Sequence, residues 1–324
     1  MGIPAPYKEI DQPAAERNLQ SMDSAQSPNH WPRISVVTPS CNQGQFIEET
    51  IQSVLLQGYP NLEYMILDGG SKDETTQVIK KYERHLAYWH SRKDEGQADA
   101  INQGMRLATG EVLCWLNSDD LYLPGTLLEV GRRLRGKTER CCLVYGSALT
   151  MQEDGEALQG GARIAGKFDP ETLTYSDFIV QPSAFWTKKL WLQVGELNKK
   201  YQYVLDWEWF IRASKVTDFE CVPRFFSVYR LHAQHKTRTG GSQRIAEINE
   251  VIGQYAPESW KQLYKFVFPR YQKLIWTRRL LMRMRIPGST YLLPLFFPRI
   301  LYQEGSKSRM HLMNILYMYG LDPS

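Results

Sequence analysis

Cysteine is scarce in this sequence, and its spacing shows no metal or disulfide pattern. The chain has five cysteines in 324 residues, an odd number, and no two of them form a C-x-x-C pair. This excludes a disulfide-stapled scaffold and argues against a thiolate zinc site. We expect reduced and mostly buried thiols at Cys41, Cys114, Cys141, Cys142 and Cys221.

Long apolar runs are also absent. No stretch reaches the roughly 18 uninterrupted apolar residues that a membrane-spanning helix needs. Residues 1–32 lack the apolar run of a secretory signal, so we expect a cytoplasmic protein. Hydrophobic residues make up 43% of the chain and charged residues 23%, which excludes disordered and collagen-like chains and is typical of a globular protein.

Positive charge is unevenly distributed along the chain. Residues 261–324 contain eleven lysines and arginines and only two acidic residues, a net charge of +9, whereas the whole chain carries +4. Residues 1–260 therefore carry a net charge of −5. A basic segment of this kind attracts anionic surfaces, either membrane or nucleic acid.

From Ile34 onward, short β-rich runs alternate with segments of helical periodicity. The predicted strands cover 34–38, 62–67, 86–90, 111–116 and 143–145. The predicted helices cover 46–57, a segment opened by a capping box at Ser71 and Glu74, 97–108, and a segment that starts at Pro124. This alternation predicts an α/β fold with a mostly parallel sheet covered by helices on both faces.

The predicted helix 97–108 is amphipathic. We expect its apolar stripe to face the core and its polar side chains to lie on the opposite face. The stripe contains Ala98, Ile101, Met105 and Ala108, and the polar face contains Asp99, Asn102 and Arg106.

Polar clusters follow three of the predicted strands, at 38–42, 68–71 and 117–120. The carboxyl ends of parallel strands meet at one edge of a sheet, where ligands bind, so we expect these clusters to converge there. A divalent cation would relieve the repulsion among their carboxylates. Each cluster also has a simpler explanation, because Asp68-Gly-Gly is a common turn and acids such as Asp99 and those of 118–120 complement helix dipoles.

Five segments in order, at family-like spacing, resemble the inverting glycosyltransferases of family 2, which have the GT-A fold. They are Val37–Gln43 (VTPSCNQ), Leu67–Asp73 (LDGGSKD), Asp94–Gly104 (DEGQADAINQG), Ala108–Glu111 (ATGE) and Trp115–Asp120 (WLNSDD). The likeness continues through Gln181–Phe185, Asp206–Phe210 and Tyr229–His232. It covers about residues 34–236.

The resemblance implies a GT-A nucleotide-diphospho-sugar transferase fold with a C-terminal helical basic extension. We expect a flexible leader over 1–32, the catalytic domain over 33–240, and the extension over 241–324.

The resemblance further implies that a nucleotide-diphosphate sugar, with uridine diphosphate as the expected carrier, lies across the strand ends. Thr38 and Pro39 would border the base. Asp68 would bond to the base or the ribose, and Asp99 would lie near the base. The expected donor-binding residues are Thr38, Pro39, Asn42, Asp68, Asp99, Ser118 and Arg230.

A Mg²⁺ or Mn²⁺ cofactor on the diphosphate is implied as well. Asp119 matches the second acid of the family's D-x-D motif and would hold the metal. Asn117 replaces the first acid, so a ligand oxygen is kept but its charge is lost, and Asp120 would assist. Arg230 and His232 match a segment near the diphosphate, where either would neutralise the leaving group and His232 would also serve as a metal ligand.

Asp206 matches the family's catalytic base. An acceptor hydroxyl must lose its proton as it attacks the anomeric carbon, and a carboxylate can take that proton late in the transition state. The simpler alternative is a helix cap, with Trp207 in an apolar stripe behind it and Glu208 and Arg212 forming an i,i+4 pair. Glu208 would replace Asp206 as the base if the helix were rotated.

Partners follow from the same segments. The expected acceptor is a glycan or a lipid-linked molecule, and Trp186, Trp207 and Trp209 either stack on a sugar or pack in the core. The basic extension either packs on the catalytic domain or attaches it peripherally to the anionic inner face of a bacterial cell membrane. No nucleic-acid-binding motif accompanies the charge, so we expect no nucleic-acid partner.

Two other functions remain open from the sequence. A sugar nucleotidyltransferase has a similar fold, but its glycine-rich loop after the first strand carries Arg or Lys, and Cys41–Gln45 has neither. A catalytically inactive scaffold on the same fold is supported only by Asn117.

Overall fold

The structure is a computed structural model that describes residues 31–152, 157–232, 236 and 240–270, together with 273, 276, 277, 280, 283 and 318. The described residues fall into two compact units. The first contains those up to Phe168 and from Ile179 to His232, and the second contains those in 169–178 and from 236 onward. The predicted leader lies almost wholly outside the described residues, and the functional boundaries at 32 and 240 stay predictions.

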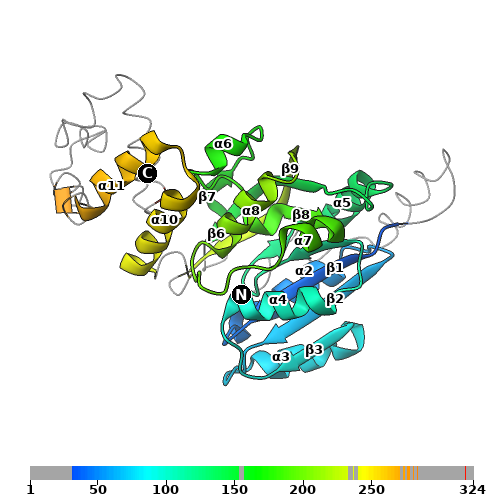
Figure 1. The fold of residues 1–324 in the computed structure, drawn as a ribbon. Helices are drawn as coiled ribbons and strands as arrows, with labels where there is room; N and C mark the ends of the chain where they lie inside the picture. The colour runs from blue at the N-terminus through cyan, green and yellow to red at the C-terminus, as the bar shows by residue number, and fades with distance from the viewer. Residues whose placement is uncertain are drawn as a thin grey trace. The chain divides into compact units, whose positions relative to one another are not determined.

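The first unit is built on one mixed sheet with helices on both faces (Figure 1). Its strands are β1 (Ile34–Ser40), β2 (Leu62–Asp68), β3 (Tyr88–Ser91), β4 (Val112–Trp115), β5 (Leu121–Tyr122), β6 (Leu143–Gln152), β7 (Ala157–Arg163), β8 (Ala184–Thr187) and β9 (Phe219–Leu231). Its helices are α2 (Gly44–Leu55), α3 (Thr75–Tyr82), α4 (Gln97–Leu107), α5 (Thr126–Leu134), α7 (Lys188–Val194) and α8 (Leu205–Ser214). The predicted α/β class is confirmed.

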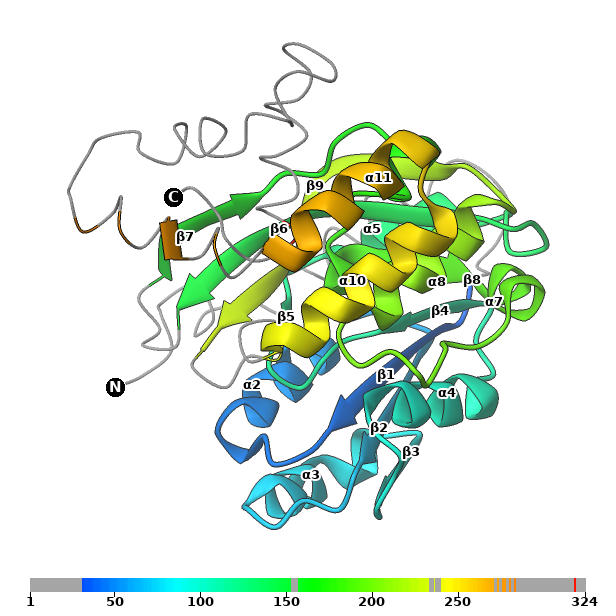
Figure 2. The same ribbon diagram turned by 60° about the vertical axis from the view of Figure 1, so that its left-hand side comes forward.

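The strand order is β3-β2-β1-β4-β8-β6-β9-β5, with β7 paired to β6. The first four strands are parallel, and Figure 2 shows β1 between β2 and β4. Beyond β4 the sheet is mixed, because β8 runs antiparallel to both β4 and β6 while β9 runs parallel to β6. The long strand β9 therefore returns the chain to the same edge as the ends of β1 and β4.

Alternation along the strands explains the two layers of helices. Ile34 and Val36 point to the face covered by α2, α3 and α5, where they join one apolar core cluster. Val37 points to the opposite face, toward α4. There Gly104 lies so close to the strand that an added Cβ would come within 3.0 Å of the Val37 side chain. The helix can approach β1 this closely because glycine has no Cβ.

Several local predictions need correction. The helix after β2 has Glu74 as its N-cap residue with no side-chain cap bond, so the predicted capping box is wrong. Asp73 makes the hydrogen bonds at the start of this helix instead. Its carboxylate accepts from the N–H and the hydroxyl of Thr75 and from the Gly44 N–H. Helix α5 begins at Thr126, two residues after Pro124. The thiols are free, but only Cys114 is fully buried.

The second unit contains α6 (Pro170–Leu173), α10 (Gly241–Tyr255) and α11 (Glu258–Val267). Tyr175 stacks on Trp260 with ring centroids 4.0 Å apart, and the Tyr264 hydroxyl donates to the Tyr175 carbonyl oxygen. Residues 169–178 thus belong with these helices.

In the part of the chain that is described, no helix has the length and apolar character needed to cross a lipid bilayer.

Candidate active site

The three polar clusters lie at one edge of the sheet. Strand β1 is the parallel neighbour of both β2 and β4, so the turns that follow these three strands emerge side by side. Their predicted convergence is confirmed. Residues 230–232, at the end of β9, complete this edge. They lie more than 100 positions after the turn 117–120 in the chain.

The turns after β1 and β2 are joined through Asn42. This residue has a φ of +53°, in the left-handed region that asparagine tolerates better than most residues. Its backbone N–H donates to the Ser71 hydroxyl at 2.6 Å, and its side-chain oxygen accepts from the Lys72 N–H at 2.9 Å. Its predicted contact with the donor stays a prediction.

Asp68 organises the turn after β2. It is fully buried, and its carboxylate accepts hydrogen bonds from the Gly70 and Ser71 N–H groups and from the Ser71 and Ser91 hydroxyls. The turn role considered from the sequence is therefore present. Thr38 and Pro39 are buried in β1, and the Thr38 hydroxyl lies 3.1 Å from that of Tyr64.

The turn after β4 is held by a residue that the sequence analysis missed. The Thr50 hydroxyl on α2 lies 2.9 Å from the carbonyl oxygens of both Ser118 and Asp120. The side-chain oxygen of Asn117 accepts from Gln97 at 2.8 Å. The amide that replaces the first acid of D-x-D thus connects this turn to the start of α4.

Asp119 is brought together with His232. The Asp119 Oδ2 and His232 Nε2 atoms are 2.9 Å apart, and the His232 side chain is 1% exposed. Two residues predicted as metal ligands from distant parts of the chain are therefore neighbours.

Asp120 has a different environment from Asp119. Its buried carboxylate accepts a hydrogen bond from the Arg230 backbone N–H at 3.1 Å and one from Asn117. Burial, reinforced by the negative charge of Asp119, raises the pKa of Asp120 well above its usual range. In this arrangement Asp120 connects the turn after β4 to the end of β9.

Arg230 is buried among groups from α2. Its guanidinium pairs with Glu49, donates to the Asp119 carbonyl oxygen at 3.0 Å, and lies 4.9 Å from the centroid of the Phe46 ring. The Phe46 ring also contacts His232, with ring centroids 4.6 Å apart. The sequence analysis missed Phe46 and Glu49, although with Thr50 they share the i, i+3, i+4 spacing of one helix face.

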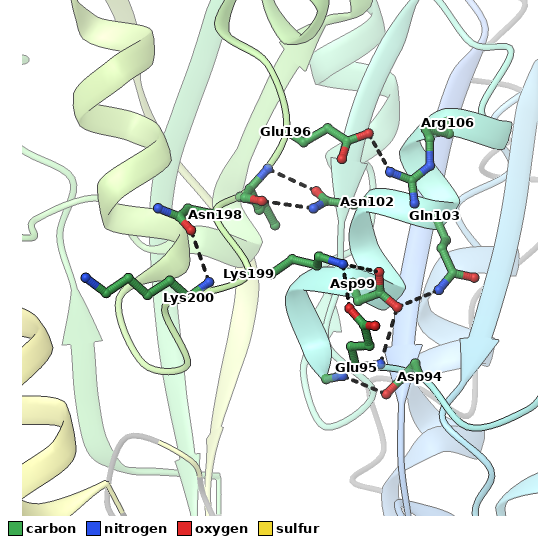
Figure 3. Close-up of polar contacts among 12 residues, drawn as sticks. Asp94, Glu95, Asp99, Asn102, Gln103, Arg106, Glu196, Asn198, Lys199 and Lys200 are labelled. Atoms are coloured by element: carbon green, nitrogen blue, oxygen red, sulfur yellow. Dashed lines mark hydrogen bonds and ion pairs between the residues drawn. The ribbon is translucent and has the colours of Figure 1, made fainter.

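Asp99 lies on α4, next to a segment from the second half of the unit (Figure 3). Its carboxylate accepts from the Gln103 amide at 2.7 Å and from the Glu95 N–H, and it pairs with Lys199. Burial opposes its ionisation, but these three contacts together lower the pKa of Asp99. Its predicted position near the base stays a prediction.

The polar face of α4 is partly covered by a segment from the second half of the unit. Asn102 is 1% exposed, and its amide exchanges two hydrogen bonds with the backbone of Leu197. Arg106 pairs with Glu196 one turn further along. The sequence did not predict this cover, because periodicity shows which residues share a helix face, but not which distant segment lies against it.

Asp206 lies in the first turn of α8, where its Oδ1 accepts from the Trp207 N–H at 2.9 Å. The N-cap residue is Val204. Glu208 is buried and paired with Arg212 in the predicted i,i+4 geometry. The three tryptophans considered for sugar stacking, Trp186, Trp207 and Trp209, are completely buried and pack in the core.

The side chains of Asp119 and His232 fit a metal ion that binds together with a diphosphate. Among the residues that the structure describes, no three His, Cys, Asp or Glu side chains are grouped to hold a metal ion on their own. The 2.9 Å between Asp119 Oδ2 and His232 Nε2 is close to the separation of about 3 Å expected for adjacent ligands on a metal with bonds of about 2.1 Å. Mg²⁺ usually combines one or two protein ligands with substrate phosphates.

Comparison with known proteins now assigns the class. The sequence model described as Glycosyl transferase family 2 matches residues 35–146. A PGL/p-HBAD biosynthesis glycosyltransferase of Mycobacterium bovis is 30% identical over 185 residues, which cover 56% of this chain and 69% of that protein. The Bacillus subtilis glycosyltransferase TuaG, named for teichuronic acid biosynthesis, is 34% identical over 157 residues, or 46% of this chain and 58% of that protein.

Solved structures agree on the fold. The mannosyltransferase PcManGT from Pyrobaculum calidifontis, in complex with GDP-Man and Mn²⁺, superposes with a TM-score of 0.55 at 17% identity, covering 96% of this chain and 94% of that chain. S. aureus TarS 1-349 in complex with UDP-GlcNAc has a TM-score of 0.52 at 14% identity, covering 89% and 80%. The predicted GT-A fold is confirmed.

The sequence matches define an enzyme that transfers glycosyl groups. The chain belongs to glycosyl transferase family 2, as its sequence motifs predicted.

Proposed function

We propose that this protein transfers a sugar from a nucleotide diphosphate, UDP in the first instance, to a glycan or lipid-linked acceptor, with inversion at the anomeric carbon. The observation that carries the proposal is the Asp119–His232 pair, 2.9 Å apart at the carboxyl edge of the sheet. This edge is where α/β sheets bind ligands. The structural neighbour PcManGT, solved in complex with GDP-Man and Mn²⁺, supports a nucleotide-sugar donor and a divalent metal.

Asp119 and His232 would hold Mg²⁺ or Mn²⁺ against the diphosphate. When bound, the metal would neutralise charge that develops on the leaving diphosphate. Arg230 adds a positive charge beside Asp119, and Glu49 and Phe46 fix its guanidinium. Asp120 orients the turn by accepting from the Arg230 N–H.

Asp206 would act as the general base. In an inverting transfer the acceptor hydroxyl attacks from the side opposite the diphosphate, so one carboxylate on that side is enough to take the proton. The position of Asp206 in the first turn of α8 supports the role, because the helix N-terminus stabilises its ionised form. Glu208 in the same turn is buried and paired with Arg212, so we assign the role of base to Asp206.

The remaining donor contacts are proposed for the turns after β1, β2 and β4. Thr38, Pro39, Asn42 and Asp68 would surround the nucleoside, with Asp99 nearby, and Ser118 would face the diphosphate. The names of the two relatives, PGL/p-HBAD and teichuronic acid biosynthesis, support an acceptor of the bacterial cell envelope. We propose that the enzyme works in the cytoplasm, attached peripherally to the inner face of the membrane through its basic extension.

The test is thermal unfolding of the full chain with UDP, GDP, CDP, ADP and dTDP, each with and without Mn²⁺. A diphosphate at a hundred times its dissociation constant stabilises the protein by about 2.7 kcal/mol, which is visible as a rise in melting temperature. We expect a Mn²⁺-dependent rise with UDP that is lost in Asp119→Ala. Asn61→Ala is the matched control, because Asn61 lies just before β2, at the opposite edge of the sheet, where its side-chain amide donates to the Trp31 carbonyl oxygen.

Product analysis then tests the chemistry. With UDP-glucose, UDP-galactose and UDP-GlcNAc as donors, Asp206→Asn should lower sugar transfer about 10²- to 10⁴-fold and keep UDP binding. NMR of the wild-type product should show the inverted anomer. Binding without any turnover in the wild type would indicate the scaffold function. Formation of a sugar nucleotide from a sugar phosphate and a nucleoside triphosphate would indicate a nucleotidyltransferase.

A further inference from the structure

A short segment, Val194–Lys199, makes hydrogen bonds to both helix α8 and helix α4. On the α8 side, the Arg212 guanidinium donates to the carbonyl oxygens of Val194 and Glu196, both at 2.8 Å. The Trp209 indole N–H donates to the Gly195 carbonyl oxygen at 2.9 Å. These bonds fix the segment to the helix that carries Asp206.

On the α4 side, one buried asparagine makes the central contact (Figure 3). The Asn102 Nδ2 donates to the Leu197 carbonyl oxygen at 2.9 Å, and the Leu197 N–H donates to the Asn102 Oδ1 at 3.0 Å. Both residues are buried, at 1% and 3% exposure. The pair is flanked by a more exposed ion pair between Arg106 and Glu196.

Helix α4 is itself fixed to the donor half of the sheet. Gly104 packs directly on the Val37 side chain and lies near Leu67, so the helix has little freedom to shift along β1 and β2. The ends of these two strands lead into the turns proposed to hold the nucleoside. A continuous path of contacts thus runs from those strands through the buried Asn102 to α8.

We propose that Asn102 is a positioning residue for the general base. By pairing with both backbone groups of Leu197, it sets the place of the first turn of α8, and so of Asp206, relative to the donor. The inference rests on the proposed role of Asp206. The expected effect is large because a misplacement of about 1 Å at a reacting group costs on the order of 100-fold in rate.

The first test measures geometry and needs no substrate. In Asn102→Ala, hydrogen exchange of the backbone amides in 195–208 should become faster than in wild type, while exchange in the matched Asn61→Ala variant stays unchanged in this region. Asn102→Asp is the second variant, because it keeps the side-chain volume and the acceptor for the Leu197 N–H. If Asn102→Ala does not fold, Asn102→Asp takes its place in the experiment and should show the same faster exchange. Unchanged exchange in 195–208 would overturn the proposal.

The second test measures turnover as UDP release from UDP-glucose, UDP-galactose and UDP-GlcNAc. Asn102→Ala should lower kcat by about 10- to 100-fold and leave the UDP dissociation constant within a factor of two. Arg106→Ala, which breaks only the exposed pair, should keep both values.

A double-mutant cycle separates positioning from general support of the fold. If Asn102 acts through Asp206, adding Asn102→Ala to Asp206→Asn should not lower kcat further, whereas independent effects would multiply. Multiplying losses, wild-type kcat in Asn102→Ala, or a parallel loss of UDP binding would each overturn the inference. Full activity of Asp206→Asn alone would instead refute the base assignment, and the exchange measurement would still report on the Asn102 contact.

Discussion

The His232 Nε2 and Asp119 Oδ2 atoms lie 2.9 Å apart although 113 residues separate them in the chain. The contact forms because β9 runs parallel to β6 and ends at the same edge as β4. Phe46 packs on the His232 ring and fixes its position. The two halves of the unit thus meet at the proposed metal site.

His232→Ala should weaken metal-dependent nucleotide binding. Removing one of two protein ligands is expected to raise the dissociation constant of UDP in Mn²⁺ at least about 10-fold, which corresponds to about 1.4 kcal/mol. Binding of UDP without metal should stay unchanged. Titration calorimetry with and without Mn²⁺ measures both, and His85→Ala, on the exposed 3₁₀ turn after α3, is the control. Equal weakening in both conditions would contradict the metal role.

Glu63→Gln should destabilise the fold and spare the site. Glu63 is 5% exposed and accepts hydrogen bonds from Thr109 and Ser35 at the edge of the sheet opposite the site. Burial opposes its ionisation, but these bonds and Arg33 lower the pKa of Glu63 below its usual value. Charged hydrogen bonds of this kind are worth about 1.5–3 kcal/mol each, so we expect a loss of that order at pH 7.

The pH dependence provides the check. Because the folded-state pKa of Glu63 lies below the unfolded value of about 4.3, its stabilisation is fully present above that pH and is lost as the pH falls through the folded-state pKa. The difference between wild type and Glu63→Gln in urea unfolding should therefore shrink below about pH 4. Glu48→Gln, which alters an exposed pair with Lys81, should change little at either pH. A difference independent of pH would show that the charge of Glu63 is not responsible.

Gly104→Ala should destabilise the packing of α4 on β1. The added Cβ would come within 3.0 Å of both γ-methyl groups of Val37. Overpacking of this kind costs about 1–3 kcal/mol. Thermal unfolding measures the loss, and a second change, Val37→Ala, should recover part of it by removing the γ-methyls. The control is Gly253→Ala on α10, where the new Cβ meets nothing within 4 Å and helix propensity predicts a small gain. No rescue in the double variant would contradict the steric explanation.

The full chain should bind anionic vesicles through its basic extension. Trp276 is 63% exposed and Leu280 is 41% exposed, four residues apart, and the side chains of Lys273 and Arg283 are exposed nearby in sequence. Aromatic and aliphatic side chains flanked by cations favour the interface of an anionic bilayer. Trp276→Ala should lower co-sedimentation with phosphatidylglycerol vesicles several-fold. Leu192→Ala, which removes a side chain 70% exposed in the first unit, should not.

The dependence of vesicle binding on salt and on lipid charge tests whether the contact is electrostatic. Binding should fall as the ionic strength rises, because the attraction of the basic residues is screened. Equal binding to neutral phosphatidylcholine vesicles, or none to either type, would contradict an electrostatic membrane contact.

The first half of the sheet was predictable because its local patterns agree with its tertiary context. Strand β1, strand β2 and helix α4 lie within about two residues of their predicted ranges, since each has a clear apolar period and ends near Pro, Gly or polar residues. The convergence of the three turns followed from parallel pairing alone. The position of Asp119 in the site followed in the same way.

The second half was less predictable for physical reasons. Strand β8 has four residues and β5 has two, too few for a period to emerge, and β9 is interrupted by Pro223. The contacts of Thr50, Glu49 and Asn102 are with backbone or side chains far along the chain. Their residue types show capacity for hydrogen bonds but contain no information on the partner.

The position of β9 has a consequence for biosynthesis. This strand lies between β6 and β5. The edges of β6 and β5 that pair with β9 therefore stay unpaired until β9, which ends at residue 231, has been synthesised. Unpaired strand edges favour association between chains. A nascent or truncated chain that stops before Phe219 should therefore aggregate, although it contains all of the residues that match the family model. The enzyme's solubility during translation is thus coupled to completion of the same strand that brings His232 to Asp119.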